Sequence, residues 1–152
     1  MRRKDKELTR LQDIEDILLH APVVLLGLLD GDRPYVVPLD FGYADGALYV
    51  HSAQAGRKID LLKRNPNVFF VVYTDHTVLL GPETCTSTSR FRSVMGEGRA
   101  AFLQSLDEKK RGLDIIMSKF APGPYAYNEA RLEKTAVIRI DVESMTGKKH
   151  GF

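Results

Sequence analysis

The stretch His51-Ser52-Ala53-Gln54-Ala55-Gly56-Arg57-Lys58 decides how this chain is interpreted. It follows an apolar, β-prone run at residues 47–50, and it leads into Ile59-Asp60-Leu61-Leu62, which has helical spacing. We therefore expect a strand that ends at His51, then a tight turn and the start of a helix. The first turn of a helix leaves backbone N–H groups without internal partners, and an anion can accept their hydrogen bonds.

The side chains of this turn favour a phosphate group. Ser52 offers a hydroxyl donor, Gly56 allows close approach of the backbone, and Arg57 and Lys58 add two positive charges. Hydrogen bonds to charged groups contribute roughly 1.5–3 kcal/mol each, so a few of them could anchor a phosphorylated cofactor. From these residues alone, a loop with solvated cations is an equal alternative. The stretch matches neither common phosphate-loop motif, G-x-x-x-x-G-K-[ST] or G-x-G-x-x-G.

The composition indicates a soluble protein of one domain, residues 1–152. The chain has 152 residues, of which 43% are hydrophobic and 28% charged, as in ordinary globular domains. A net charge of +2 is too small to indicate a nucleic-acid or membrane surface. One cysteine, Cys85, excludes an internal disulfide, and the charged N-terminus is followed by no apolar signal segment. We expect a cytoplasmic protein with no nucleic-acid or membrane partner.

The order of the elements favours a mainly β structure. Apolar spacing predicts helices at residues 5–20, 59–64 and 105–120, with a helical turn within 125–131. Six strands are expected at residues 23–29, 34–43, 47–51, 68–73, 90–103 and 135–142. These helices do not alternate regularly with the strands, so an antiparallel β-barrel with helices packed outside is favoured over a βαβ sheet.

Several segments carry finer expectations. Residues 68–73 are almost continuously apolar, so this strand should be covered on both faces. Residues 77–80 could be a strand or a loop. Pro38 cannot donate to a ladder, so it should lie at a bulge or an edge. Gly96 and Gly98 suggest a sharp bend. The helix at 105–120 should bury Leu113, Ile116, Met117 and Phe120, and residues 146–150 should form a cationic tail.

Five pieces occur in an order that resembles a known family. They are Pro34-Tyr35-Val36-Val37-Pro38-Leu39, Asp45-Gly46-Ala47-Leu48-Tyr49, His51-Ser52-Ala53 with Gly56-Arg57-Lys58, Arg90-Phe91-Arg92-Ser93-Val94 with Gly98, and Thr146-Gly147-Lys148. This series resembles the FMN-binding split-barrel proteins of the pyridoxamine 5′-phosphate oxidase-like superfamily. The nearest likeness is to the branch that includes nitroimidazole-resistance reductases, and it extends from Leu11 to Lys148.

The resemblance implies a six-stranded antiparallel split barrel that forms a homodimer, with FMN in each of two interface grooves. Carried onto this chain, the phosphate would be held by Ser52, Ala53, Arg57 and Lys58, beside Gly56. The edge of the isoalloxazine ring would lie along Val36, Val37, Pro38 and Leu39. The partner subunit would contribute Arg90, Phe91, Arg92 and Ser93. Phe91 departs from the family, in which tyrosine is frequent at this position, so a hydroxyl contact to cofactor or substrate is in doubt.

The implied activity is an FMN-dependent oxidoreductase, with electrons passing from a reduced nicotinamide to a small nitroaromatic or quinone. The flavin would supply the redox chemistry. Lys148, or N–H groups beside Pro38, could stabilise negative charge on the reduced ring. His51 is the candidate catalytic residue, as proton donor or substrate contact, and the alternative is an exposed strand end.

Two other classes stay open. One is a flavin-binding carrier or redox sensor without turnover, and the other is a split barrel that uses haem or the deazaflavin F420. No metal site is expected, because His20, His51, His76 and His150 lack ligand spacing.

Overall fold

The structure is a computed structural model that describes residues 3–152. Its fold is mainly β with flanking helices, as predicted, but it has seven strands and not six. The additional strand is Glu7–Leu8, which pairs with the end of the last strand. The strands and helices are β1 Glu7–Leu8, α1 Leu11–His20, β2 Val23–Asp30, β3 Arg33–Ala44, β4 Ala47–Ala53, α2 Arg57–Arg64, β5 Asn67–Leu79, β6 Thr88–Phe102, α3 Leu106–Ser118, α4 Glu129–Glu133 and β7 Thr135–His150, with 3-10 turns at Lys4–Lys6 and Thr84–Thr86.

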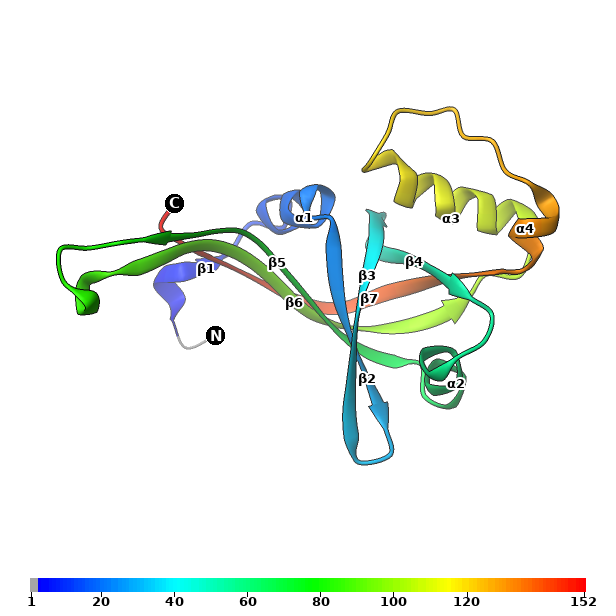
Figure 1. Cartoon of the computed structure of the whole chain (residues 1–152), viewed down its shortest axis with the longest axis horizontal. Helices are drawn as coiled ribbons and strands as arrows, with labels where there is room; N and C mark the ends of the chain where they lie inside the picture. The colour runs from blue at the N-terminus through cyan, green and yellow to red at the C-terminus, as the bar shows by residue number, and fades with distance from the viewer. Residues whose placement is uncertain (1–2) are drawn as a thin grey trace.

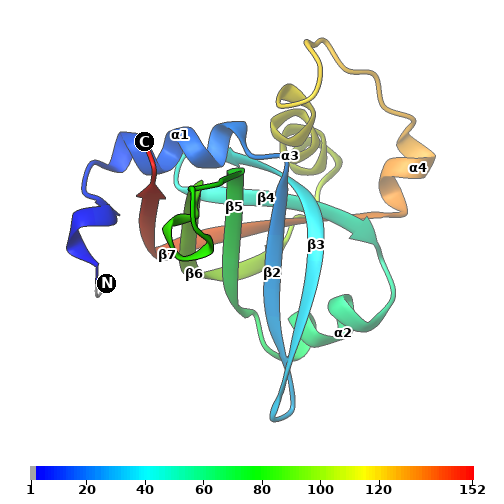
Figure 2. The same ribbon diagram turned by 60° about the vertical axis from the view of Figure 1, so that its left-hand side comes forward.

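All strand pairings are antiparallel, and together they close a barrel. The strand order is β1-β7-β4-β3-β2-β5-β6, and a further pairing of β6 with β7 joins the two sides of the sheet. Closure removes the unpaired edges that an open sheet would present. The helices lie outside the barrel. In Figures 1 and 2, α1 and α3 lie above the strands and α2 lies below them.

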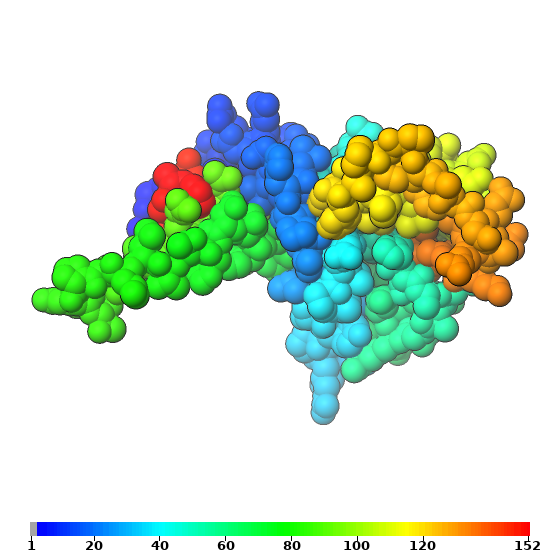
Figure 3. Space-filling view, turned by 45° about the horizontal axis from the view of Figure 1, so that its top comes forward, coloured from blue at the N-terminus to red at the C-terminus, as the bar shows by residue number. Residues whose placement is uncertain are grey.

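Strands β5, β6 and β7 extend well beyond the barrel as an arm. Figures 1 and 3 show the β5–β6 hairpin projecting from the rest of the molecule. The unsettled stretch at residues 77–80 is therefore strand as far as Leu79, after a register shift between Thr74 and Thr77. The expected tail at 146–150 is also strand, because β7 continues to His150 along β6.

The structure corrects one expectation about the strands and decides between the alternatives of another. Residues 68–73 are not covered on both faces: Val68, Phe70 and Val72 are buried, but Phe69 is 45% and Tyr73 49% exposed. The reason is that only one face of β5 packs on the core of its own chain. Pro38 lies at no bulge, because β2 and β3 stay in unbroken register. It lies in the part of β3 that pairs with β2 alone, so the edge alternative is correct.

Helix α1 is shorter than predicted. It begins at Leu11, because Glu7 and Leu8 leave the helical path to pair with Lys148 and Gly147. The helical turn expected within residues 125–131 begins at Glu129 and continues to Glu133 as α4.

Helix α3 begins at the predicted cap but buries only part of the predicted face: Ile116 is buried as expected, and Leu113 is half-buried. The Ser105 hydroxyl accepts from the Glu108 N–H, and the Glu108 carboxylate accepts from the Ser105 N–H. The buried residues are Lys109, Gly112 and Ile116, whereas Met117 and Phe120 are exposed. The helix turns this face inward because glycines allow close contact. A Cβ on Gly112 would lie 2.8 Å from a methyl group of Val137.

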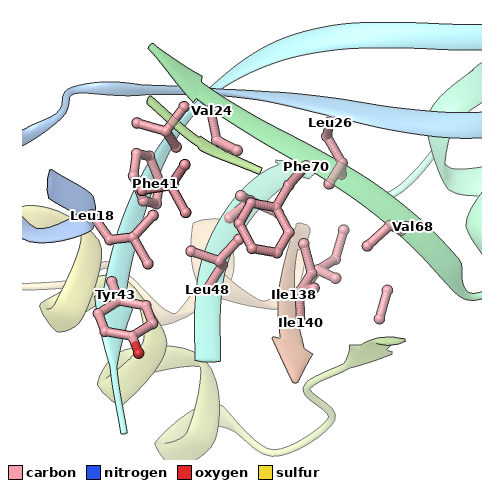
Figure 4. Close-up of a cluster of buried hydrophobic side chains, with 14 of the residues drawn as sticks. Leu18, Val24, Leu26, Phe41, Tyr43, Leu48, Val68, Phe70, Ile138 and Ile140 are labelled. Carbon is pink, nitrogen blue, oxygen red and sulfur yellow. The ribbon is translucent and has the colours of Figure 1, made fainter. Parts of the chain in front are cut away.

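The core fills the barrel with side chains from one face of each strand. Figure 4 shows Phe41, Leu48, Phe70, Ile138 and Ile140 converging, and each is almost fully buried. Gly96 and Gly98, where a sharp bend was expected, occur where β6 crosses this core, and the β6–β7 register shifts between Glu97 and Gly98. A Cβ on Gly96 would lie 2.5 Å from the Phe70 ring. Within residues 3–152, no helix is long and apolar enough to cross a membrane.

Candidate functional site

The turn between β4 and α2 has the predicted form. β4 continues through Ser52 to Ala53, and α2 begins at Arg57 after Gly56, whose φ of 117° suits glycine. The Gly56 carbonyl accepts from the N–H groups of Ile59 and Asp60. In the described chain no side chain caps this helix start, and a Cβ on Gly56 would meet nothing within 4 Å. The N–H groups at the start of α2 therefore have no side-chain cap within the described residues, so an anion could accept from them.

The two cations of this turn differ in their surroundings. The Arg57 guanidinium donates to the Asp30 carboxylate from Nε at 3.0 Å and from Nη2 at 2.8 Å, and it stacks on the Tyr35 ring at 4.6 Å. Lys58 is half-buried, and no ion pair among residues 3–152 involves it. Lys58 is therefore the cation available to a ligand, whereas Arg57 is held against the β2–β3 hairpin.

A surface cavity lies beside His51, two residues before Ala53, the last residue of β4. Its volume is about 320 Å³, and it is lined by Val23, Pro38, Leu39, Asp40 and His51. β3 supplies three of these residues, and His51 comes from β4. The structure thus brings His51 together with Pro38 and Leu39, and Ser52 connects this cavity to the turn.

The other two residues expected along the ring have different positions. Val37 is partly buried and packs against the core. Val36 is 57% exposed and lines another cavity, of about 580 Å³, with Phe69 and Leu29. Alternation along β3 places the side chains of Val36 and Val37 on opposite faces of the strand.

The second group of candidates lies on the arm. Phe91 packs against Tyr73 at 5.3 Å between ring centroids, and the Lys148 ammonium is 5.3 Å from the Phe91 centroid. His150 meets the same ring edge-on at 6.1 Å. These contacts form an aromatic cluster with one cation, which we call the arm cluster (Tyr73, Phe91, Lys148 and His150).

Arg90 and Arg92 share one surface of the arm. Their guanidinium carbons lie 4.9 Å and 4.2 Å from the centroid of the Phe152 ring. Arg92 also pairs with Asp75 at 3.4 Å. Ser93 is only 4% exposed, so its side chain is poorly placed to meet a ligand.

No hydrogen bond or ion pair among residues 3–152 joins the arm group to the turn at residues 51–58. Figure 1 shows the arm projecting to one side of the barrel and α2 lying on the other. A single chain therefore presents two separate halves of the expected site.

Sequence reasoning missed four residues that organise these halves. Asp30 and Tyr35 hold Arg57 from another hairpin, and Tyr73 and His150 complete the arm cluster. Each contact depends on which strands pair. The contacts of Tyr73 and His150 with Phe91 follow from the register of β5, β6 and β7, which the sequence alone does not give. The described residues contain no group of three or more His, Cys, Asp or Glu side chains placed to hold a metal ion.

Comparison with known proteins identifies the family. A family model described as pyridoxamine 5′-phosphate oxidase matches residues 11–149. The chain belongs to this family. The resemblance seen in the sequence is thereby confirmed.

Solved structures agree with this assignment. A protein from Bacteroides thetaiotaomicron, provisionally named a 5-nitroimidazole antibiotic resistance protein, is 34% identical with a TM-score of 0.85, covering 94% of this chain and 86% of its own. An FAD-binding protein from Mesorhizobium loti is 25% identical with a TM-score of 0.69, covering 96% and 98%. A flavocytochrome from Azotobacter vinelandii has 21% identity and a TM-score of 0.87, covering 100% and 72%, and shows the shared fold. No curated protein matches the chain.

Proposed function

We propose that this protein is an FMN-dependent oxidoreductase that transfers electrons from a reduced nicotinamide to a small electron-poor acceptor of the nitroaromatic or quinone type. The observation that carries the proposal is the arrangement along β4. His51 lines a cavity with Pro38 and Leu39, and the same strand leads directly to the uncapped start of α2 beside Lys58. A flat ring in the cavity and a phosphate at the helix start suit these two neighbouring places.

The residues present fit such a cofactor. The open space at Gly56 leaves room for a phosphate, and the first N–H groups of α2 and Lys58 would bind it. Arg57 fits less directly, because Asp30 already holds it. It would contribute positive charge from its place on Tyr35.

The relatives support a flavin as the bound group. One solved relative is named an FAD-binding protein, one a flavocytochrome, and one a nitroimidazole resistance protein. A bound flavin would supply hydride acceptance and hydride donation. The protein would supply orientation: Pro38 and Leu39 would position the ring, and His51 would hold a proton beside it.

A homodimer would complete the site. The arm cluster and the turn at residues 51–58 lie on different parts of one chain, so a second chain is needed to place one beside the other. The exposed apolar side chains Val36 and Phe69, which line the cavity of about 580 Å³, offer a surface for that contact. The proposed location is the cytoplasm, since the exposed free thiol of Cys85 suits a reducing compartment.

The absorption spectrum of the protein, purified with and without added FMN, tests the cofactor directly. We expect flavin bands, which NADH or NADPH bleaches without oxygen and a nitroaromatic or quinone restores. Absorption bands of haem or F420 in place of flavin bands would identify one of these as the cofactor and contradict the proposal of FMN. Yellow protein that neither nicotinamide reduces would favour a carrier or sensor over an enzyme.

A single substitution tests the phosphate site. Lys58→Met should weaken FMN binding by at least about tenfold, because it removes a charge-assisted contact. Titration of the apoprotein by flavin fluorescence quenching measures this affinity. The control is Lys110→Met, on α3, where the lysine pairs with Glu129 at 3.2 Å. Equal FMN affinity in both variants would refute the assignment.

A further inference from the structure

A second cavity lies on another flank of α2. It has a volume of about 320 Å³ and is bordered by α2, the end of β6, the start of α3 and the start of β7. Figure 1 shows the end of β6 and the starts of α3 and β7 near α4, with α2 below them. We call it the Lys109 cavity. Its apolar walls include Ile59, Phe102 and Ala136, and its polar groups include Lys63, Lys109 and Gln54.

Lys109 is the unusual residue of this cavity. It is only 7% exposed, and its Nζ contacts the carbonyl oxygens of Leu132 and Glu133, each at 3.4 Å. Among residues 3–152 no carboxylate lies within ion-pair distance of it. A buried ammonium group is costly unless it is paired, and two long bonds to neutral carbonyls compensate only part of that cost.

The next residue shows the contrast. Lys110 points to the surface, where its charge is already solvated, and it pairs with Glu129. The chain thus provides a carboxylate for the solvated lysine and none for the buried one. An anion from outside the chain would supply the missing partner of Lys109.

Other groups of the cavity define what such an anion would carry. Lys63 adds a second positive charge, and the described residues give it no ion pair. The amide N–H groups of Gln54 and Gln104 donate to the carbonyls of Glu133 and Phe102, which leaves the amide oxygens of both side chains as acceptors. Two cations, free amide acceptors and an apolar wall suit a phosphate attached to a flat group that bears N–H donors.

We propose that the Lys109 cavity binds a phosphate-bearing ligand of nucleotide size, with Lys109 and Lys63 contacting the phosphate. The ligand has two possible sources, a free nucleotide or the adenylate half of FAD. The second source rests on the proposed flavin function. It is considered because Gln54 belongs both to this cavity and to the turn at residues 51–58.

The test is calorimetric titration of the full-length protein with AMP and with inorganic phosphate. We expect wild type to bind AMP more tightly than phosphate. Lys63→Met should weaken AMP binding by about tenfold or more, since it removes one charged contact. Lys109→Met should abolish the binding, and Lys110→Met should leave it unchanged.

The two sources are separated by comparing FAD with FMN. If the cavity holds the adenylate half, wild type binds FAD more tightly than FMN, and Lys63→Met removes the difference. Equal affinities together with AMP binding indicate a free nucleotide. Absence of AMP and phosphate binding to folded wild type, or unchanged binding in Lys63→Met, overturns the proposal. Because Lys63 is exposed, this result holds even if Lys109→Met fails to fold, and because AMP needs no flavin, it is independent of whether the protein is yellow.

Discussion

At the scale of single residues, Lys119 joins two helices through one partly buried charge. It follows α3 directly, and its Nζ donates to the carbonyls of Leu18 and Ala21 at the end of α1, at 2.8 and 2.7 Å. The same ammonium lies 3.3 Å from the centroid of the Phe41 ring. Burial lowers the pKa of Lys119 from 10.5 to about 8.

This shift predicts a dependence of stability on pH. Between about pH 8 and pH 10 the unfolded chain keeps a proton on Lys119 that the folded chain has lost, so the free energy of unfolding should rise with pH. With solvent screening at a partly exposed group, we expect a rise of about 1 kcal/mol. Above pH 10 the effect of buried tyrosines opposes it, because burial raises the pKa of Tyr43 and Tyr127.

Urea unfolding of wild type and Lys119→Met at several pH values measures this contribution. The difference in unfolding free energy between the two proteins should shift in favour of wild type as the pH rises from 8 to 10. A difference that stays constant over this range would show that Lys119 does not titrate there.

The site residues differ in how far local sequence could place them. Ser52, Gly56 and Lys58 follow from a strand, a turn and a helix start, so their relation was predictable. His51 with Pro38 and Leu39 followed only from the family resemblance, because adjacent strands join them. The engagement of Arg57 by Asp30 was not predictable, since it depends on a hairpin 27 residues earlier in the chain.

At the scale of elements, the sequence predicts where α3 begins but only part of the helix face that packs on the barrel. Its start is encoded locally by the capping box at Ser105. Its orientation is set by two glycines that allow contact with the barrel, one of which, Gly42, lies on β3. Apolar periodicity counts Met117 but assigns no weight to a glycine, so the predicted face shares Ile116 with the observed one and misses Gly112.

Gly42→Ala should therefore destabilise the protein. A Cβ there would lie 2.5 Å from the Ile115 carbonyl oxygen, so α3 would have to move off β3. Forced overpacking of this kind costs about 1–3 kcal/mol, which chemical denaturation would measure. Gly27→Ala is the matched control on β2, where the nearest atom, the Phe69 carbonyl oxygen, is 3.1 Å away. A loss in Gly42→Ala no larger than in the control would contradict the role of this contact.

The arm is the element that sequence reasoning described least well. The predicted strand at 68–73 becomes Asn67–Leu79, and β7 runs on through the expected tail. Both extensions contain charged and polar residues, such as Asp75 and Lys149, that weaken an apolar strand signal. They form strand because β5, β6 and β7 satisfy one another's backbone groups over their length.

At the scale of the whole molecule, one chain presents the parts of the proposed flavin site in two places. The turn at residues 51–58 and the cavity at His51 lie together, whereas the arm cluster projects elsewhere (Figure 1). The fold class was predictable from element order and from the family resemblance, apart from the short β1. The resemblance also implied that residues 90–93 act from the partner chain, but local sequence did not predict how far the arm extends from the barrel.

Mixing two inactive variants tests the central claim most directly. Lys58→Glu should lose flavin because the turn is damaged, and Phe91→Asp should lose it because the arm cluster is damaged. In a dimer that contains one chain of each variant, one of the two sites combines an intact turn with an intact arm. The two variants are mixed in equal amounts, unfolded and refolded together, so that about half of the dimers contain one chain of each. Since one of the two sites in such a dimer is intact, the mixture should regain about a quarter of the wild-type flavin content, measured by absorbance per chain.

Each variant must first be shown to be folded and colourless alone, by circular dichroism and absorbance. A refolded mixture with about a quarter of the wild-type flavin would support a site shared between two chains. A mixture as colourless as its two components, or Phe91→Asp protein that is fully yellow by itself, would contradict it.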